Sequence, residues 1–258
     1  MGDIDWRTAI PGIREDGSVV AVGSTPPRAA GTVLVFPGHG YPWPGPVSEL
    51  LTELLASDTE FSRRMQACEE VFAEFVDWPL LDAVRGTFGD IGPGEADMAR
   101  PVLFAVTVSL AEQWRAAGAV PDAVVGHSCG EIAAACVAGA LSLREATKVA
   151  VLQAYWTYFA HNLDLDQIGA LREALLGELS ELRPQTADIT FISTVTGAAL
   201  DTSILDGEYW FANLRQPPLL EHAVRWAHEH GYRYFIETSP HPVLTRDIQS
   251  ILDPRGRR

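Results

Sequence analysis

The sequence predicts an α/β fold, in which a mostly parallel sheet is flanked by helices. Three apolar runs rich in β-branched and aromatic residues have the composition of buried strands: Thr32–Phe36, Asp122–Val125 and Tyr232–Glu237. A fourth candidate, Ile189–Ser193, lies between the last two. Segments with helical spacing separate all four runs, which is the alternation expected of parallel strands joined by helical crossovers.

Apolar residues that recur at helical spacing predict helices between and around these strands. The longest is entered near Asp97 and stops at Gly118, and Ser142 with Glu145 forms the capping-box pattern at the start of another. The glycine-rich residues 86–94 are expected to form a loop. The expected helices are Val47–Ala56, Phe61–Phe75, Trp78–Val84, Met98–Ala117, Ile132–Gly139, Leu143–Phe159, Gln167–Leu179, Tyr209–Leu214, Leu219–His230 and Val243–Leu252.

The length of 258 residues allows one large α/β core or two modest domains. Strands and helices alternate throughout residues 31–252, so we expect a single core domain there. Residues 1–30 contain the turn-forming pairs Pro11-Gly12 and Pro26-Pro27 and are expected to be an irregular arm or linker. Residues 253–258 are expected to be a solvated C-terminal tail.

The composition limits the classes of function. The formal net charge of −15 argues against a general nucleic-acid-binding surface. The sequence contains no run of 18 apolar residues, so no membrane span is expected. The N-terminus also lacks the pattern of a signal peptide, and a cytoplasmic location is therefore expected. The three cysteines have no Cys-x-x-Cys spacing and are expected to be reduced thiols. Neither a metal ion nor a cofactor is expected.

The segment Gly126-His127-Ser128-Cys129-Gly130 follows one of the predicted strands and precedes an alanine-rich helix. A Gly-x-Ser-x-Gly pattern in this setting is typical of a nucleophile elbow, as in α/β-hydrolase-like cores, where the serine hydroxyl is exposed on a sharp turn. The backbone N–H groups that follow lie at a helix N-terminus and suit a developing negative charge. The pattern also occurs in helix-entry loops without a catalytic role, so the motif alone leaves both interpretations open.

Six stretches resemble, in order, the landmarks of malonyl-CoA:ACP transacylases and polyketide synthase acyltransferase domains. They include Phe36-Pro37-Gly38-His39-Gly40, similar to the family's Phe-Pro-Gly-Gln-Gly, and the elbow, similar to its Gly-His-Ser-x-Gly-Glu. The resemblance extends from about residue 32 to residue 245. The six stretches are residues 36–45, 100–105, 126–131, 193–197, 209–217 and 239–244.

The resemblance implies roles for five residues. Ser128 is the expected nucleophile and His161 the general base, in ping-pong acyl transfer. The backbone N–H groups of His39 and Cys129 are the expected oxyanion hole. The backbone carbonyl of Gln216 is expected to orient the histidine, so that no carboxylate partner is required.

The histidines also have interpretations without catalysis. Without the family resemblance, His161 would be interpreted as an ordinary, partly exposed histidine near a helix boundary. His127 is expected to pack in the turn and line the acyl pocket rather than act as a base. His39 needs no role beyond its backbone N–H, and His241, in a Ser-Pro-His-Pro turn, is expected to be structural.

One departure from the family concerns the acyl pocket. Enzymes that use malonyl or methylmalonyl groups have an arginine in the helix after the elbow, where it pairs with the free carboxylate. Counting without gaps, that position is Gln153. An amide cannot form the charged bidentate pair, and a buried carboxylate without a cation is costly. We therefore expect an uncharged acyl group, unless Arg144 or Lys148 substitutes for the missing arginine.

A second departure is a deletion. Gln153 and His161 are eight positions apart, whereas in the family a small ferredoxin-like subdomain that covers the acyl pocket separates them. Its absence predicts an open groove that accepts a bulky acyl group or acceptor and also admits water. The expected function is acyl transfer from a carrier-protein or CoA thioester in polyketide-type biosynthesis. An editing acyl-thioester hydrolase and a non-catalytic docking or scaffold domain are the alternatives.

Overall fold

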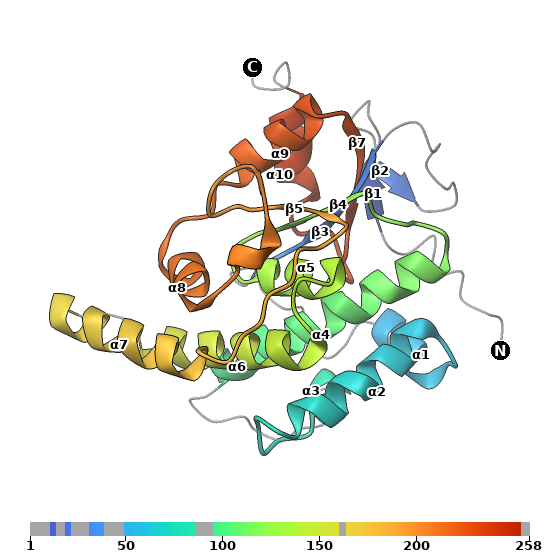
Figure 1. The fold of residues 1–258 in the computed structure, drawn as a ribbon. Helices are drawn as coiled ribbons and strands as arrows, with labels where there is room; N and C mark the ends of the chain where they lie inside the picture. Colours follow the sequence, from blue (N-terminus) through green and yellow to red (C-terminus); the bar gives the residue numbers. More distant parts are fainter. Residues whose placement is uncertain are drawn as a thin grey trace.

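The computed structural model describes residues 11–13, 19–21, 31–38, 49–85, 95–159 and 164–253. Within these ranges, seven strands form one sheet in the order β2-β1-β7-β3-β4-β5-β6. Helices lie on both faces of this sheet (Figure 1). The predicted α/β class, with helices flanking a sheet, is confirmed.

The four central strands are parallel, and the strands outside them are antiparallel. The neighbours β7 and β3, β3 and β4, and β4 and β5 run in the same direction. The outer pairs β1–β2, β1–β7 and β5–β6 are antiparallel. The strands are β1 Pro11–Ile13, β2 Val19–Ala21, β3 Gly31–Phe36, β4 Ala123–Gly126, β5 Thr190–Ile192, β6 Ala199–Leu200 and β7 Tyr232–Glu237.

The helices follow the predicted order closely, and the helix Leu143–Phe159 has the predicted bounds. Asp164 caps the next helix through Gln167, so that this helix begins at residue 165 rather than 167. No helix in the described part of the chain is long and apolar enough to span a membrane. The helices are α1 Glu49–Ala56, α2 Glu60–Phe72, α3 Leu80–Arg85, α4 Glu95–Ala116, α5 Gly130–Ala138, α6 Leu143–Phe159, α7 Leu165–Glu178, α8 Gly207–Arg215, α9 Leu220–Glu229 and α10 Thr245–Leu252, with a 3₁₀ turn at Thr202–Ile204.

Alternate residues of β3 supply two separate hydrophobic cores, because successive side chains of a strand point to opposite faces. Val33 and Val35 pack in the core that contains α9 and α10. Leu34 and Phe36 pack in the larger core, with α2, α4, α5 and α6. Both faces of the strand are therefore buried, which explains its continuous apolar sequence.

The prediction that residues 1–30 are irregular is wrong for the two segments described there. Residues 11–13, expected to turn at Pro11-Gly12, form β1, which pairs with β7 through Gly12 and Ile236. The side of β7 away from β3 offers unpaired backbone groups, and a three-residue strand satisfies them without any apolar periodicity of its own. The sheet is accordingly mixed at its edges. The boundaries at residues 30 and 252 remain predictions.

A buried carboxylate joins the end of β7 to the start of α10. The side chain of Glu237 is 2% exposed. Its Oε1 accepts hydrogen bonds from the backbone N–H of Val243 at 2.7 Å and of Leu244 at 3.1 Å, and its Oε2 from the N–H of Thr245 at 3.0 Å. These groups have no partner within the helix. Glu237 therefore holds the loop between β7 and α10 in place. The helix α10 begins two residues later than predicted.

We expect Glu237→Ala to lower the free energy of unfolding by about 3 kcal/mol or more, because it leaves several buried N–H groups without an acceptor. Urea unfolding followed by circular dichroism measures this change. The matched control is Glu229→Ala, which removes an exposed carboxylate at the end of α9 and is expected to change the value by about 0.5 kcal/mol or less. Equal effects of the two substitutions would contradict the anchoring role of Glu237.

Candidate active site

The predicted nucleophile lies at the carboxyl edge of the sheet, in the turn between β4 and α5. Ser128 has a φ of 54°, and it is the one residue other than glycine with positive φ in the part of the chain that the structure describes. This left-handed conformation is unfavourable for a residue with a side chain and persists only where the surroundings enforce it. The turn is closed by a hydrogen bond from the N–H of Gly130 to the carbonyl of His127 at 3.0 Å. The geometry is that of a nucleophile elbow.

Two glycines allow the elbow to pack directly against the loop after β3. A Cβ at Gly130 would lie 2.2 Å from the carbonyl oxygen of Phe36. A Cβ at Gly38 would lie 2.2 Å from the carbonyl oxygen of His127 and 3.1 Å from the Cβ of Ser128. These atoms are mostly backbone and cannot move aside cheaply. The glycines of both motifs are therefore required by a close approach of two main chains.

Two of the predicted partners of Ser128, His161 and His39, lie outside the described residues. Cys129 follows the serine, and its side chain is 9% exposed. Gln216 ends α8, with its N–H bonded to the carbonyl of Ala212 at 2.9 Å. The roles of the base, the two oxyanion donors and the orienting carbonyl therefore stay predictions.

Gln153 is buried in α6, and its amide nitrogen is used within the protein. Its side chain is 1% exposed, and Nε2 donates to the carbonyl of Trp210 at 3.1 Å and to Oδ1 of Asn213 at 3.0 Å. Oε1 is buried and has no hydrogen-bond partner among the described residues. The side chain of Gln153 is neutral and is held by two hydrogen bonds, so this position provides no cation.

Neither of the two basic residues considered as substitutes reaches this position. The Nε of Arg144 lies 2.6 Å from a carboxylate oxygen of Glu74, and its guanidinium stacks over Phe75. The Nζ of Lys148 lies 4.0 Å from a carboxylate oxygen of Glu178. Both cations are directed toward carboxylates on other segments, Glu74 in the turn after α2 and Glu178 at the end of α7.

A buried carboxylate underneath the elbow was not predicted as part of the site. Glu131, in the first turn of α5, is 0% exposed. Its Oε2 accepts hydrogen bonds from the hydroxyl of Tyr209 at 2.6 Å and from Nδ2 of Asn213 at 2.9 Å. Its Oε1 contacts the backbone N–H of Thr194 and lies 2.9 Å from the Oγ1 of that residue. Glu131 thus ties the elbow helix to α8 and to the loop after β5.

Burial raises the pKa of Glu131, and the hydrogen bonds from Tyr209, Thr194 and Asn213 oppose this shift only in part. The Oγ1 of Thr194 lies 2.9 Å from both Oε1 of Glu131 and the carbonyl oxygen of Gly126, yet a hydroxyl has one proton. That proton lies between the two acceptor oxygens, so that Thr194 links Glu131 to the end of β4.

The two described histidines near the site have the surroundings of packing residues. Burial lowers the pKa of His127, an effect that Asp247 opposes, and its Nδ1 has no partner within the described chain. A neutral imidazole without an orienting partner is poorly placed to act as a base. The carbonyl of His241 accepts a hydrogen bond from the Oγ of Ser239 at 2.6 Å, in the loop that Glu237 anchors. This agrees with the structural role expected of His241.

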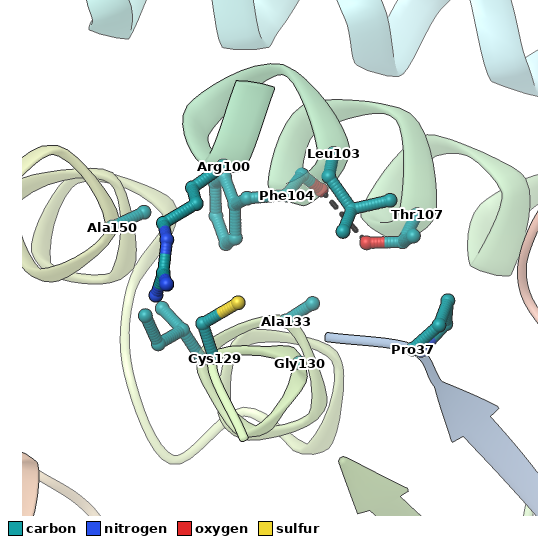
Figure 2. A pocket seen from close by; sticks show the side chains of 10 residues that line it. Pro37, Arg100, Leu103, Phe104, Thr107, Cys129, Gly130, Ala133 and Ala150 are labelled. Atoms are coloured by element: carbon teal, nitrogen blue, oxygen red, sulfur yellow. Dashed lines mark hydrogen bonds between the residues drawn. The ribbon is translucent and has the colours of Figure 1, made fainter. Parts of the chain in front are cut away.

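A narrow cavity separates the elbow from α4. Figure 2 shows that Pro37, Arg100, Thr107, Cys129 and Ala150 surround it, with the guanidinium of Arg100 extending toward the elbow. Its volume of about 10 Å³ is room for one water molecule at most. This space is too small for an acyl chain.

An open groove of about 470 Å³ lies farther along α6. Phe75 and Trp78, from the segment between α2 and α3, line it together with Pro101 of α4 and Val151 and Tyr155 of α6. Tyr155 is 50% exposed, in the last turns of a helix that otherwise packs in the core. An apolar surface is therefore open to solvent next to the position of the predicted deletion.

The described residues contain no group of three or more His, Cys, Asp or Glu side chains that could hold a metal ion. The three cysteines are buried and free of disulfide bonds. The described residues of the elbow offer a serine hydroxyl, backbone N–H groups at a helix N-terminus and a buried hydrogen-bond network around Glu131.

Comparison with known proteins places most of the chain beside one family. The model of the acyl transferase domain matches residues 33–162 and 154–255. Mycoketide-CoA synthase of Mycobacterium tuberculosis is 38% identical over 90% of this chain, and erythronolide synthase EryA2 of Saccharopolyspora erythraea is 35% identical over 94%. The chain spans 7% and 8% of the lengths of these two relatives.

Solved acyltransferase domains have the same fold. The domain from module 8 of the salinomycin polyketide synthase superposes with a TM-score of 0.77 at 36% identity, over 92% of this chain and 71% of that one. A loading acyltransferase of the avermectin modular polyketide synthase gives 0.74 at 31% identity, over 86% of this chain and 91% of that one.

The alignment to mycoketide-CoA synthase is longer than the part of this chain that it covers. The match to mycoketide-CoA synthase extends over 304 positions but covers 90% of this chain, or about 232 of its 258 residues, so about 72 positions have no counterpart here. The two segments of the family model meet at residues 154–162. This overlap coincides with the interval between Gln153 and His161.

We expect the stability that Glu131 contributes to fall as pH rises. Because its folded-state pKa is raised, the folded protein retains a proton that the unfolded chain releases above about pH 4.3. Between that pH and the raised pKa of the folded protein, the free energy of unfolding falls by up to about 1.4 kcal/mol for each pH unit. The substitution Glu131→Gln removes this dependence.

Urea unfolding of the wild type and of Glu131→Gln at pH 5, 6.5 and 8 measures the difference. The advantage of the wild type over the variant is expected to shrink with rising pH, while titrations of other groups cancel in the comparison. A difference that stays constant over this range would show that Glu131 is ionised in the folded protein.

Proposed function

The chain belongs to the acyl transferase domain family, and we propose that it transfers an acyl group through an ester on Ser128. The observation that carries the proposal is the position of this serine. It is held at a φ of 54° between β4 and the N-terminus of α5, against the loop that follows β3. The donor is an acyl thioester of a carrier protein or of CoA, and the setting is polyketide-type biosynthesis in the cytoplasm.

The proposed reaction has two half-reactions. The Oγ of Ser128 attacks the thioester carbonyl and His161 accepts the hydroxyl proton, while the N–H groups of Cys129 and His39 stabilise the oxyanion. The C–S bond breaks, the thiolate takes the proton from His161, and the acyl group remains as a serine ester. A second thiol, hydroxyl or amine then attacks this ester by the same steps in reverse, and the free serine is restored.

We propose that the acyl group is uncharged and bulky. Gln153 offers no cation, and Arg144 and Lys148 are directed toward Glu74 and Glu178. A carboxylate placed in this pocket would lose its hydration without gaining a charged partner. The gap of about 72 aligned positions supports the absence of the small covering subdomain, and the exposed groove along α6 supports room for a bulky substrate.

The same openness supports a second candidate, an acyl-thioester hydrolase. A site without a cover admits water, which competes with the acceptor for the serine ester. A non-catalytic scaffold domain is the third candidate. The strained turn at Ser128 argues against it, because backbone strain of this kind is retained where it serves a reaction.

We expect intact-mass spectrometry to detect an acyl adduct when the protein is incubated with a panel of acyl-CoA and acyl-carrier-protein thioesters. The adduct should disappear in Ser128→Ala and persist in Cys129→Ala, which retains the backbone N–H. Turnover to free acid without a stable adduct would favour the hydrolase. Neither adduct nor turnover with any donor would favour the scaffold.

We expect malonyl-CoA to load Ser128 at least about tenfold more slowly than butyryl-CoA, because one unpaired buried charge costs more than 1.4 kcal/mol. Single-turnover loading of both donors, followed by intact mass, measures the ratio. Equal rates would contradict the proposal that the acyl group is neutral. Arg100, the cation beside the narrow cavity in Figure 2, would then be the candidate partner of the malonyl carboxylate.

A further inference from the structure

The carbonyl oxygen of the predicted nucleophile accepts two hydrogen bonds of different origin. The N–H of Glu131 donates to the carbonyl of Ser128 at 3.0 Å, as an ordinary bond within the first turn of α5. The Nδ2 of Asn213 donates to the same oxygen at 3.1 Å from α8, 85 positions later in the chain. The second bond is not required by the turn or by the helix.

The geometry of the peptide bond gives this second contact a consequence. The carbonyl of Ser128 and the N–H of Cys129 belong to one planar, trans peptide unit, so they point in opposite directions and rotate together. A buried side chain that holds the carbonyl therefore also sets the direction of the N–H. Hydrogen bonds accepted by a carbonyl also polarise its peptide unit and make the attached N–H a stronger donor.

The orientation of the amide of Asn213 follows from counting donors and acceptors. The carbonyl of Ser128 only accepts, so the atom of Asn213 beside it must be Nδ2. Oδ1 then faces Gln153, which must present its own Nε2, and the second proton of that group goes to the carbonyl of Trp210. Gln153 thereby fixes the side-chain amide that holds the nucleophile.

We propose that Asn213 is a positioning residue for acyl transfer at Ser128, and that Gln153 acts through it. The inference rests on the proposed function, since it requires Ser128 as nucleophile and the N–H of Cys129 as an oxyanion donor. Asn213 is 3% exposed and also donates to Glu131, so its position is determined from three sides. Gln153 then supports the rate of the reaction in addition to excluding a charged acyl group.

The test compares Asn213→Ala and Asn213→Asp with Tyr209→Phe. Asp matches Asn in shape but as a carboxylate has no proton to donate to Ser128. Tyr209→Phe removes a hydrogen bond to Glu131 from the same buried network without touching Ser128. Gln153→Met, which leaves Asn213 in place but removes the donor that orients it, is the fallback if the Asn213 variants do not fold.

Two readouts are required. The first is the rate at which a fluorophosphonate ester labels Ser128, followed by intact mass; the P–O bond forms, the P–F bond breaks and fluoride leaves with the hydroxyl proton. The second is the steady-state transfer of a butyryl group from butyryl-CoA. We expect both Asn213 variants to lower the labelling rate and kcat by about tenfold, with KM changed by about twofold or less, as for an interaction made in the transition state.

Tyr209→Phe is expected to lose about as much thermal stability as the Asn213 variants but to keep its labelling rate within about threefold of the wild type. The labelling rate of Gln153→Met is expected to lie between those of Tyr209→Phe and the Asn213 variants. Wild-type labelling rates in both Asn213 variants, or in Gln153→Met if only that variant folds, would overturn the inference. An equal loss in Tyr209→Phe would assign Asn213 a structural role and would also overturn it. If the wild type itself neither reacts with the phosphonate nor accepts an acyl group, the proposed function fails, whatever the variants do.

Discussion

Ser128, the proposed nucleophile, can occupy a left-handed turn only because the surrounding structure holds the turn closed. Ser128 would relax toward an ordinary conformation if the elbow were free, since a side chain at positive φ is strained. The loop after β3 packs against the turn at a distance that only glycine permits. On the other side, Glu131 and Asn213 bind the elbow to elements that follow it by more than 60 residues. The position of the Ser128 hydroxyl depends on this support from both sides.

The polar groups under the elbow form one connected set in a region that excludes water. Glu131, Asn213 and Gln153 are each nearly fully buried, and each has a partner on another element. A buried polar network of this kind is stabilising only when its members are satisfied. We propose that the identity of residue 153 has two consequences: it limits which acyl groups can be neutralised, and it orients the amide of Asn213 that contacts Ser128. In this proposal, selection of the substrate and support of the elbow are coupled through one side chain.

Much of the fold could be predicted because its central strands carry their burial in their sequence. Thr32–Phe36 is buried along its whole length and Tyr232–Glu237 in its second half, so their composition alone identified them as strands. The edge strands could not be found in this way. β1, β2 and β6 have two or three residues each, and whether such a segment pairs depends on a neighbouring strand that offers unpaired backbone groups. That neighbour is known only once the central strands are ordered.

The sequence by itself predicted the turn that holds the proposed nucleophile, because a Gly-x-Ser-x-Gly turn between a strand and a helix is a local structure with local requirements. It also determined that residue 153 carries no charge. Only the tertiary structure decided what supports them, since Gln153 finds Asn213 60 positions away and Asn213 finds Ser128 85 positions away. A buried polar side chain must have a partner, but its own sequence neighbourhood does not say which one. The packing of α6 and α8 against the elbow makes that choice.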